Sequence, residues 1–218
     1  MNETPNTPQL LGTGPRSPCE DKVNNITNKE WFIIHPSDFW VYNKLDLSLR
    51  LGYNCGPCGV DVLKPNNYIV RPAINFCGMG RFSRIERLTD STDHLHPGEF
   101  WCEIFKGEHL SVDFINKKTV LIVKGYKNPK NPSYKWNCWI KVKREIKFPK
   151  ILENLAGNYE CINCEFIGGN LIEVQFRRNL DFRWGNSIAI PVWDKNQSHK
   201  NLIFVKDEDY LRYGFFIG

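Results

Sequence analysis

The residues best suited to chemistry lie between residues 68 and 113, in an order typical of a phosphate-binding site. A short apolar run, Tyr68–Pro72, predicts a strand. Gly78 and Gly80 follow, and glycine lets backbone N–H groups come close to a ligand. A basic segment at residues 81–87 comes next, and carboxylate-bearing strands come after it. This order suits a polyphosphate held between loop amides and cationic side chains, although an ordinary β-meander with a glycine turn fits the same residues.

A second polar group follows a Gly-Gly pair later in the chain. Alternation along the outgoing strand places Glu173, Gln175 and Arg177 on one face. A three-residue loop would set Glu165 opposite Glu173, whereas a two-residue loop would set Cys164 there. Two opposed carboxylates repel unless a cation lies between them, and Mg²⁺, which takes carboxylate and phosphate oxygens, is the natural candidate. The alternative is a solvated sheet face of mixed charge.

Few helices and many strands are expected to position these groups. Ser37 predicts the cap of a helix at residues 38–51 that ends at Gly52, and a second helix is expected at Pro149–Ala156. The other strand candidates are residues 100–105, 110–115, 119–125, 135–142, 159–167, 171–177 and 201–205. Because strands do not alternate with helices, we predict an α+β fold of antiparallel sheets rather than a doubly wound sheet.

In order and spacing these pieces resemble the ATP-grasp superfamily, in particular its glutathione-synthase-like and ribosomal-protein-glutamate-ligase-like members and small phage-type relatives. The matching segments are Lys44-Leu45-x-x-Ser48-x-x-Leu51-Gly52, Tyr68-Ile69-Val70-Arg71-Pro72 with Gly78-x-Gly80, Glu103-Ile104-Phe105-x-Gly107-Glu108, and Glu173-Val174-Gln175. The resemblance covers residues 44–181. It implies two small lobes of antiparallel sheet with few helices, at residues 29–98 and 99–218, after an extended or disordered arm at residues 1–28.

The resemblance also implies an activity, that of an ATP- and Mg²⁺-dependent carboxylate–amine ligase that works through an acyl phosphate. The implied nucleotide-binding positions are Lys44, Arg71, Gly78, Gly80, Glu103, Ile104, Phe105 and Glu108. Arg71 and the glycines would hold phosphates, the backbone of residues 103–105 would meet the adenine edge, and Glu108 would reach the ribose. The implied Mg²⁺ ligands are Glu165, Glu173 and Gln175, and the implied catalytic residues are Arg71 and Arg177.

Departures from the family pattern leave a non-catalytic alternative open. Arg71 replaces the usual Lys, which keeps the charge but changes the donor geometry. Gln175 replaces the usual Asn, and only an arm precedes Trp31 where full-length ligases have a substrate-binding domain. The second hypothesis is therefore a degenerate ATP-grasp scaffold that docks onto a larger assembly, such as a viral one, through residues 1–28.

Two cysteine pairs and a basic strand indicate other possible chemistry. Cys55-Gly56-Pro57-Cys58 has the spacing of a redox dithiol, but no helix is expected to begin there. With Cys161 and Cys164 it could form a zinc site, although buried thiols fit both pairs better. Residues 135–144 interleave aromatic and cationic side chains, as nucleic-acid-binding strands do. Alternation favours a core strand with a basic exterior instead, so nucleic acid is not the expected partner.

Composition and charge exclude several classes of protein. The 218 residues are 41% hydrophobic and 24% charged, as in ordinary globular proteins, and the net charge of +5 favours an anionic ligand. No apolar run reaches the ~18 residues of a membrane span, and the N-terminus has no secretory signal. We therefore expect a cytoplasmic protein. The partners that the resemblance implies are ATP and a carboxylate and an amine substrate, free or on a peptide or protein, and the second hypothesis adds a protein bound through residues 1–28.

Overall fold

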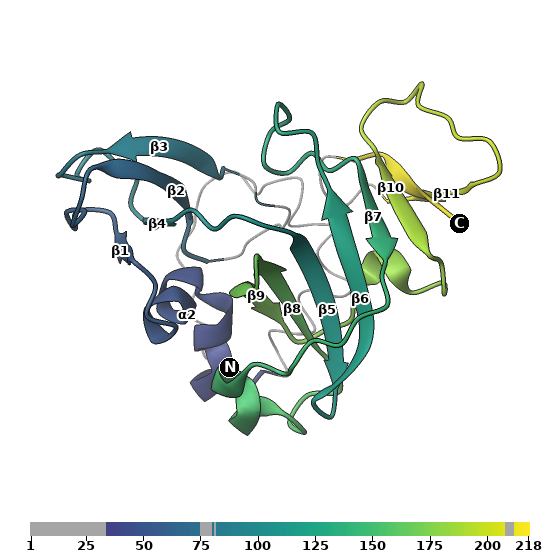
Figure 1. The fold of residues 1–218 in the computed structure, drawn as a ribbon, viewed down its shortest axis with the longest axis horizontal. Helices are drawn as coiled ribbons and strands as arrows, with labels where there is room; N and C mark the ends of the chain where they lie inside the picture. Colours follow the sequence, from purple (N-terminus) through teal and green to yellow (C-terminus); the bar gives the residue numbers. More distant parts are fainter. Residues whose placement is uncertain (1–33, 75–79, 81, 208–211) are drawn as a thin grey trace, which may run out of the picture.

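A computed structural model describes residues 34–74, 80, 82–207 and 212–218, which form two antiparallel sheets (Figure 1). The smaller sheet has four strands in the order β1-β4-β2-β3. They are β1 (Cys55–Pro57), β2 (Asn66–Pro72), β3 (Arg84–Leu88) and β4 (Glu99–Glu103).

The larger sheet has eight strands in the order β11-β12-β10-β7-β6-β5-β8-β9. They are β5 (His109–Ile115), β6 (Lys118–Tyr126), β7 (Cys138–Lys141), β8 (Ile162–Ile167), β9 (Asn170–Gln175), β10 (Ile188–Val192), β11 (Ile203–Lys206) and β12 (Gly214–Ile217). The predicted α+β class with antiparallel sheets is confirmed. The chain passes from one sheet to the other between Glu103 and His109, so β4 belongs to the smaller sheet, although the sequence division placed residue 99 in the second lobe.

The helix expected at residues 38–51 forms as two pieces. They are the 3-10 helix η2 (Pro36–Tyr42) and the α-helix α2 (Lys44–Arg50). Asn43 separates them because its backbone is extended, with φ −92° and ψ 102°, while its side chain accepts two N–H bonds from the first turn of α2. The prediction of Ser37 as the cap is therefore wrong. Gly52 does adopt the left-handed φ of +72° expected after a helix end.

The other helical segments are also short. The helix expected at Pro149–Ala156 is a 3-10 helix, η3 (Lys150–Leu155), and a further one is η4 (Leu180–Phe182). Among the described residues, no helix has the length and apolar character needed to cross a bilayer.

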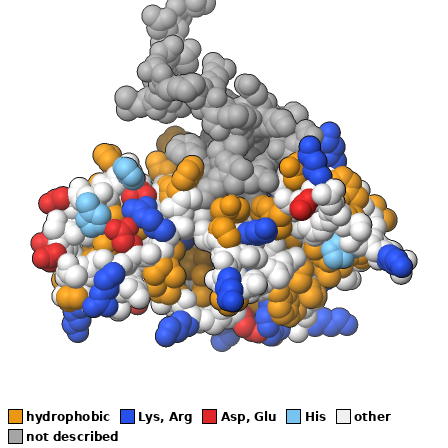
Figure 2. All heavy atoms as spheres, turned by 90° about the horizontal axis from the view of Figure 1, so that it is seen from above, with side chains coloured by type: hydrophobic (Ala, Val, Ile, Leu, Met, Phe, Trp, Pro, Cys, Tyr) orange, Lys and Arg blue, Asp and Glu red, His pale blue; other side chains and the backbone are white. Residues whose placement is uncertain are grey.

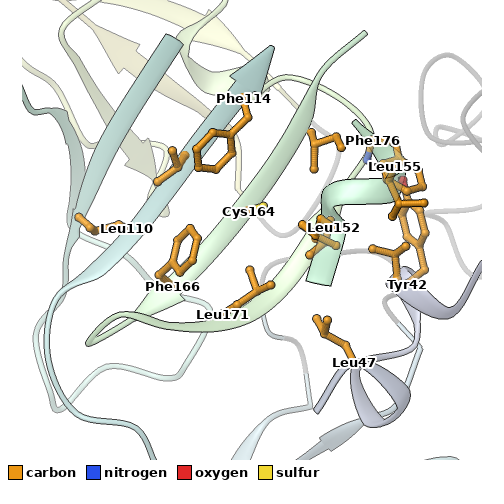
Figure 3. Packing of buried hydrophobic residues seen from close by; sticks show 14 of the residues in the cluster. Tyr42, Leu47, Leu110, Phe114, Leu152, Leu155, Cys164, Phe166, Leu171 and Phe176 are labelled. Carbon is orange, nitrogen blue, oxygen red and sulfur yellow. Dashed lines mark hydrogen bonds between the residues drawn. The ribbon is translucent and has the colours of Figure 1, made fainter. Parts of the chain in front are cut away.

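The main hydrophobic core lies on one face of the larger sheet (Figure 3). Val112, Cys164 and Val174 point into it from β5, β8 and β9, and each is at most 1% exposed. Leu47 of α2 and Leu152 of η3 pack over them. Since side chains alternate along a strand, the polar residues between these positions must occupy the opposite face of the same three strands.

Three strands were not expected from the sequence. β1 and β10 each contain a proline, which is uncommon in strand interiors, and β12 is only four residues long. The strand expected at residues 135–142 shortens to β7. Alternation along that strand predicts Trp139 on the exterior with the lysines, but the Trp139 side chain is only partly exposed. It packs instead against the core cluster formed by β6, β10 and β12.

Candidate active site

The face of the larger sheet opposite the main core carries a patch that we call the polar floor. The register forms it from two rows of paired residues: Ser111, Glu165 and Glu173, and beside them Asp113, Asn163 and Gln175. Directly paired residues of antiparallel strands point to the same face, so the two rows bring six polar side chains together. Of these six, the sequence had predicted only the three proposed metal ligands, Glu165, Glu173 and Gln175.

The β8–β9 hairpin brings Glu165 and Glu173 together in a way that the sequence did not predict. The loop has two residues, because Ile167 pairs with Asn170, and Gly168 and Gly169 have φ values of +57° and +87°. That loop alone would place Cys164 opposite Glu173. A register shift between Glu165 and Phe166 moves the pairing by one residue and restores Glu165 opposite Glu173.

Glu173 is held by a lysine from α2, which packs against both sheets, through β1 and β9. Lys44 Nζ of α2 lies 3.2 Å from Glu173 Oε2, and the two side chains are only 8% and 12% exposed. The amide of Gln175 donates to Glu173 Oε1 at 2.7 Å. Burial raises the pKa of Glu173, but Lys44, Gln175 and Arg71 more than offset this and lower it below its usual value. Glu173 is therefore ionised at neutral pH.

Arg71 approaches the polar floor from β2 of the smaller sheet. Its guanidinium lies 5.2 Å from the centre of the Phe100 ring, and its buried Nε has no hydrogen-bond partner among the described residues. Burial lowers the pKa of Arg71, while Glu173 and Glu165 act in the opposite direction. A buried donor without a partner is uncommon in proteins, so Arg71 has capacity for an anionic ligand at the point where the two sheets meet.

Glu165 pairs with a histidine that the sequence analysis did not select. His109 Nε2, at the start of β5, lies 2.9 Å from Glu165 Oε2. The His109 ring meets Trp136 and Trp139 edge-on, with centroid distances of 4.7 and 5.4 Å. The two paired carboxylates, Glu165 and Glu173, thus each have a basic partner within this chain.

The chemistry of these donors fits Mg²⁺, although the side chains do not form a closed metal cage. Glu165, Glu173 and the Gln175 amide supply the hard oxygen ligands that Mg²⁺ takes together with phosphate oxygens and water. Within the described ranges, no group of three or more His, Cys, Asp or Glu side chains could hold a metal ion by itself. A metal here would depend on ligands from a bound phosphate.

The residues expected to contact the nucleotide, Glu103, Ile104 and Phe105, lie at the start of the linker between the sheets, residues 104–108, and have different partners. The Glu103 side chain accepts the Asn54 N–H at 2.8 Å, and the Phe105 ring meets Tyr53 edge-on at 4.6 Å. Ile104 lies between them and is partly exposed.

Glu108, expected to reach the ribose, forms ion pairs with a residue of the larger sheet and one of the segment after β7. It pairs with Lys124 at 2.6 Å and with Arg144, and these two cations lower the pKa of Glu108 to about 2. Reaching a ribose would require Glu108 to leave both partners.

The described predicted residues that remain, Gly80 and Arg177, lie outside the two rows of the polar floor. Gly78 lies outside the described residues, while Gly80 has φ +65° and its carbonyl accepts a hydrogen bond from Ser133 at 2.9 Å. Arg177 follows β9, and its charge acts on Asp113. Burial raises the pKa of Asp113 although Asn163 and the Asn179 backbone N–H hydrogen-bond to it. This polar network had no motif in the sequence that could have revealed it.

Among the described cysteines, the pairs Cys55/Cys58 and Cys161/Cys164 do not come together as the zinc alternative requires. Cys161 and Cys164 are buried, and burial raises the pKa of both thiols. No Cys or His cluster suited to a metal occurs among the described residues. On the face shown in Figure 2, Lys and Arg side chains are scattered among hydrophobic, acidic and other groups, and they form no continuous stripe on the part of that face that is described.

No protein-family model and no curated protein matches the chain. Solved structures do match. One is of an ATP-grasp superfamily protein from Archaeoglobus fulgidus, with 12% identity and a TM-score of 0.47 over 82% of this chain. The others include the ATP-grasp ligase PsnB (12% identity, TM-score 0.37, 66% of this chain) and an L-amino acid ligase from Bacillus licheniformis (12% identity, TM-score 0.39, 64% of this chain).

This chain spans 64% of the length of the first matched protein, 53% of the second and 41% of the third.

Proposed function

We propose that the chain binds ATP with Mg²⁺ between its two sheets and uses it as a carboxylate–amine ligase. One observation carries the proposal: cationic Lys44 and Arg71 reach the carboxylate pair Glu165 and Glu173 from the other side of the junction between the sheets. This is the charge arrangement that a metal–triphosphate complex requires, with cations for the phosphates and carboxylates for the metal.

The residues would divide the work by their positions. Arg71, with its unpartnered Nε, and Lys44 would contact phosphate oxygens beside the loop that ends at Gly80. The linker at Ile104 and Phe105 would meet the adenine. Arg177, at the far end of the floor, would stabilise charge on the transferred phosphoryl group or hold the substrate carboxylate.

Bound Mg²⁺, held by Glu165, Glu173 and the Gln175 amide oxygen, would neutralise charge on the phosphates. Transfer of the γ-phosphoryl group to a substrate carboxylate would form an acyl phosphate, and attack by an amine would release phosphate and leave an amide.

The proposal is tested first by nucleotide binding. Thermal unfolding is measured with ATP alone, with Mg²⁺ alone and with both. A ligand at 100 times its Kd adds about 2.7 kcal/mol of stability, so the combination should raise the midpoint clearly. Glu165→Gln should abolish the Mg²⁺-dependent part of this shift. The matched control is Glu160→Gln, because Glu160 is an exposed carboxylate paired only on the surface with Arg178. Absence of any shift at millimolar ATP, with or without the metal, would sink the proposal.

Ligase chemistry is tested separately by measuring ADP release from ATP in the presence of pooled amino acids and short peptides. Stimulation by a carboxylate–amine pair, with amide product seen by mass spectrometry, is expected. Nucleotide binding without turnover on any pair would support the second candidate, a scaffold that has lost catalysis.

One observation favours that second candidate. Glu173 already pairs with Lys44 and accepts a hydrogen bond from Gln175, and Glu165 already contacts His109, so both carboxylates have partners within the chain without a metal. A non-catalytic scaffold predicts ATP binding that is absent or independent of Mg²⁺. The docking segment proposed for it, residues 1–28, lies outside the described residues.

A further inference from the structure

Cys55 and Cys102 face each other across the ladder between β1 and β4. The register pairs them directly. The neighbouring pair is the hydrogen-bonded one, since Glu103 N–H donates to the Asn54 carbonyl at 2.9 Å, which makes Cys55 and Cys102 a non-hydrogen-bonded pair. Cα atoms of such pairs lie about 4.5 Å apart, within the range of about 4.4–6.8 Å that a disulfide spans. Both residues are free thiols in this structure.

The two thiols differ in how easily a reagent reaches them. Cys55 is half-buried and lines an open groove of about 420 Å³ together with Tyr53, Asp61 and Trp101. Cys102 is fully buried, with 0% of its surface exposed. Cys55, which is partly exposed, is therefore the more accessible of the two thiols.

The surroundings also divide the chemistry between the two sulfurs. A hydrogen bond from the Cys102 thiol lowers the pKa of Cys55, and Arg71 acts in the same direction against burial and Glu103. The same hydrogen bond and burial raise the pKa of Cys102. Cys55 is thus the better nucleophile, and Cys102 keeps its proton until a second step.

Cys58, the neighbour in sequence, is not placed to be the partner. Cys58 follows the end of β1 at Pro57 and packs against the core cluster of the smaller sheet, which contains Tyr68 and Trp101, whereas Cys55 pairs with Cys102. The Cys-x-x-Cys spacing therefore does not bring its own two thiols together.

We propose that Cys55 and Cys102 form an oxidisable dithiol site that reacts with hydroperoxides. The Cys55 thiolate attacks one peroxide oxygen, the O–O bond breaks, and the other oxygen leaves as water or an alcohol after taking a proton, which gives a sulfenic acid at Cys55. The Cys102 sulfur then attacks the Cys55 sulfur, the S–O bond breaks, and the hydroxyl leaves as water with the Cys102 proton. In sum, two thiols are oxidised to one disulfide and one hydroperoxide is reduced.

The test uses the full chain with Cys19 and Cys77 replaced by serine, because both lie outside the described residues. The protein is treated with one equivalent of hydrogen peroxide, quenched with an alkylating agent and mapped by peptide mass spectrometry. The expected product has lost two hydrogens and carries a cross-link between the peptides of Cys55 and Cys102. Mapping a link from Cys55 to Cys58 instead, or finding both Cys55 and Cys102 unoxidised, would overturn the proposal.

Single variants separate the two steps. Cys102→Ser should leave a sulfenic acid at Cys55 that a dimedone probe traps, whereas Cys55→Ser should slow oxidation of Cys102 by more than about tenfold. Cys58→Ser is the matched control and should form the cross-link as readily as the parent. Equal oxidation of Cys102 with and without Cys55 would contradict the order of the steps. Circular dichroism checks that each variant folds. If a variant does not fold, the cross-link map of the protein that lacks only Cys19 and Cys77 decides the proposal.

Discussion

Replacing Lys44 by methionine should destabilise the protein strongly, because it would leave Glu173 ionised and buried without its nearest cation. At the observed 3.2 Å, the attraction between the two charges is about 5 kcal/mol at an effective dielectric constant of about 20. Removing one partner of a buried ion pair typically costs about 3–5 kcal/mol. Because Arg71 and the Gln175 amide remain beside Glu173, we expect the lower end, about 3 kcal/mol at pH 7.

The pH dependence of this cost follows from the sign of the pKa shift. In the parent protein the pKa of Glu173 is lowered, so its contribution to stability is present above the unfolded value of about 4.3 and is lost as the pH falls through the folded value. Burial is already the largest single influence on the pKa of Glu173, and in Lys44→Met the opposing effect of Lys44 is lost, so that pKa should rise. The ionised carboxylate then costs stability at neutral pH, and this cost disappears as the pH falls below about 4.3. The gap between parent and variant should therefore narrow from pH 7 to pH 4.

Urea unfolding at both pH values measures the gap, and a double-mutant cycle with Glu173→Gln isolates the pair. Lys44→Met combined with Glu173→Gln should be less destabilised than the sum of the two single variants, by about 2 kcal/mol. Arg50→Met, which breaks the exposed pair with Asp46, is the control and should cost no more than about 1 kcal/mol. A cost below about 1 kcal/mol for Lys44→Met, or one that does not change with pH, would refute the reasoning.

Two further predictions concern the backbone. Gly168→Ala should destabilise the protein by more than about 2 kcal/mol, because a Cβ there would lie 2.0 Å from the Lys106 carbonyl oxygen in the linker. Gly169→Ala has nothing within 4 Å of its Cβ and should cost about 1 kcal/mol. Equal costs for the two variants in urea unfolding would contradict the close approach at Gly168. Asn43→Ala should cost about 1 kcal/mol by removing the cap of α2, whereas Ser37→Ala should cost less by the same assay, and the reverse order would show that the expected helix start was correct after all.

Local patterns were sufficient for much of the larger sheet. Strands β5, β6, β8 and β9 lie close to their expected ranges, because their apolar residues alternate over whole strands and one buried face determines the side of each residue. Where the local signal is weak, as in proline-containing β1 and β10, only pairing with neighbouring strands defines the element.

The candidate site shows the same division. The sequence was sufficient to predict Glu173 on an acidic strand, Arg71 on a separate strand and a polar face on the strand of Glu173. It could not decide the register of the β8–β9 hairpin, because the choice between Glu165 and Cys164 depended on a bulge that packing of the whole sheet selects.

By itself the sequence determined the class of fold, the two faces of the central strands and the residue types available for an anionic ligand, because these follow from periodicity within one strand. Only the tertiary structure decided that Lys44 compensates Glu173, that His109 contacts Glu165 and that Cys55 pairs with Cys102 rather than with Cys58. Each of these contacts joins residues 47 to 129 positions apart in the printed sequence. Such contacts depend on how sheets and helices stack, and no local spacing encodes that.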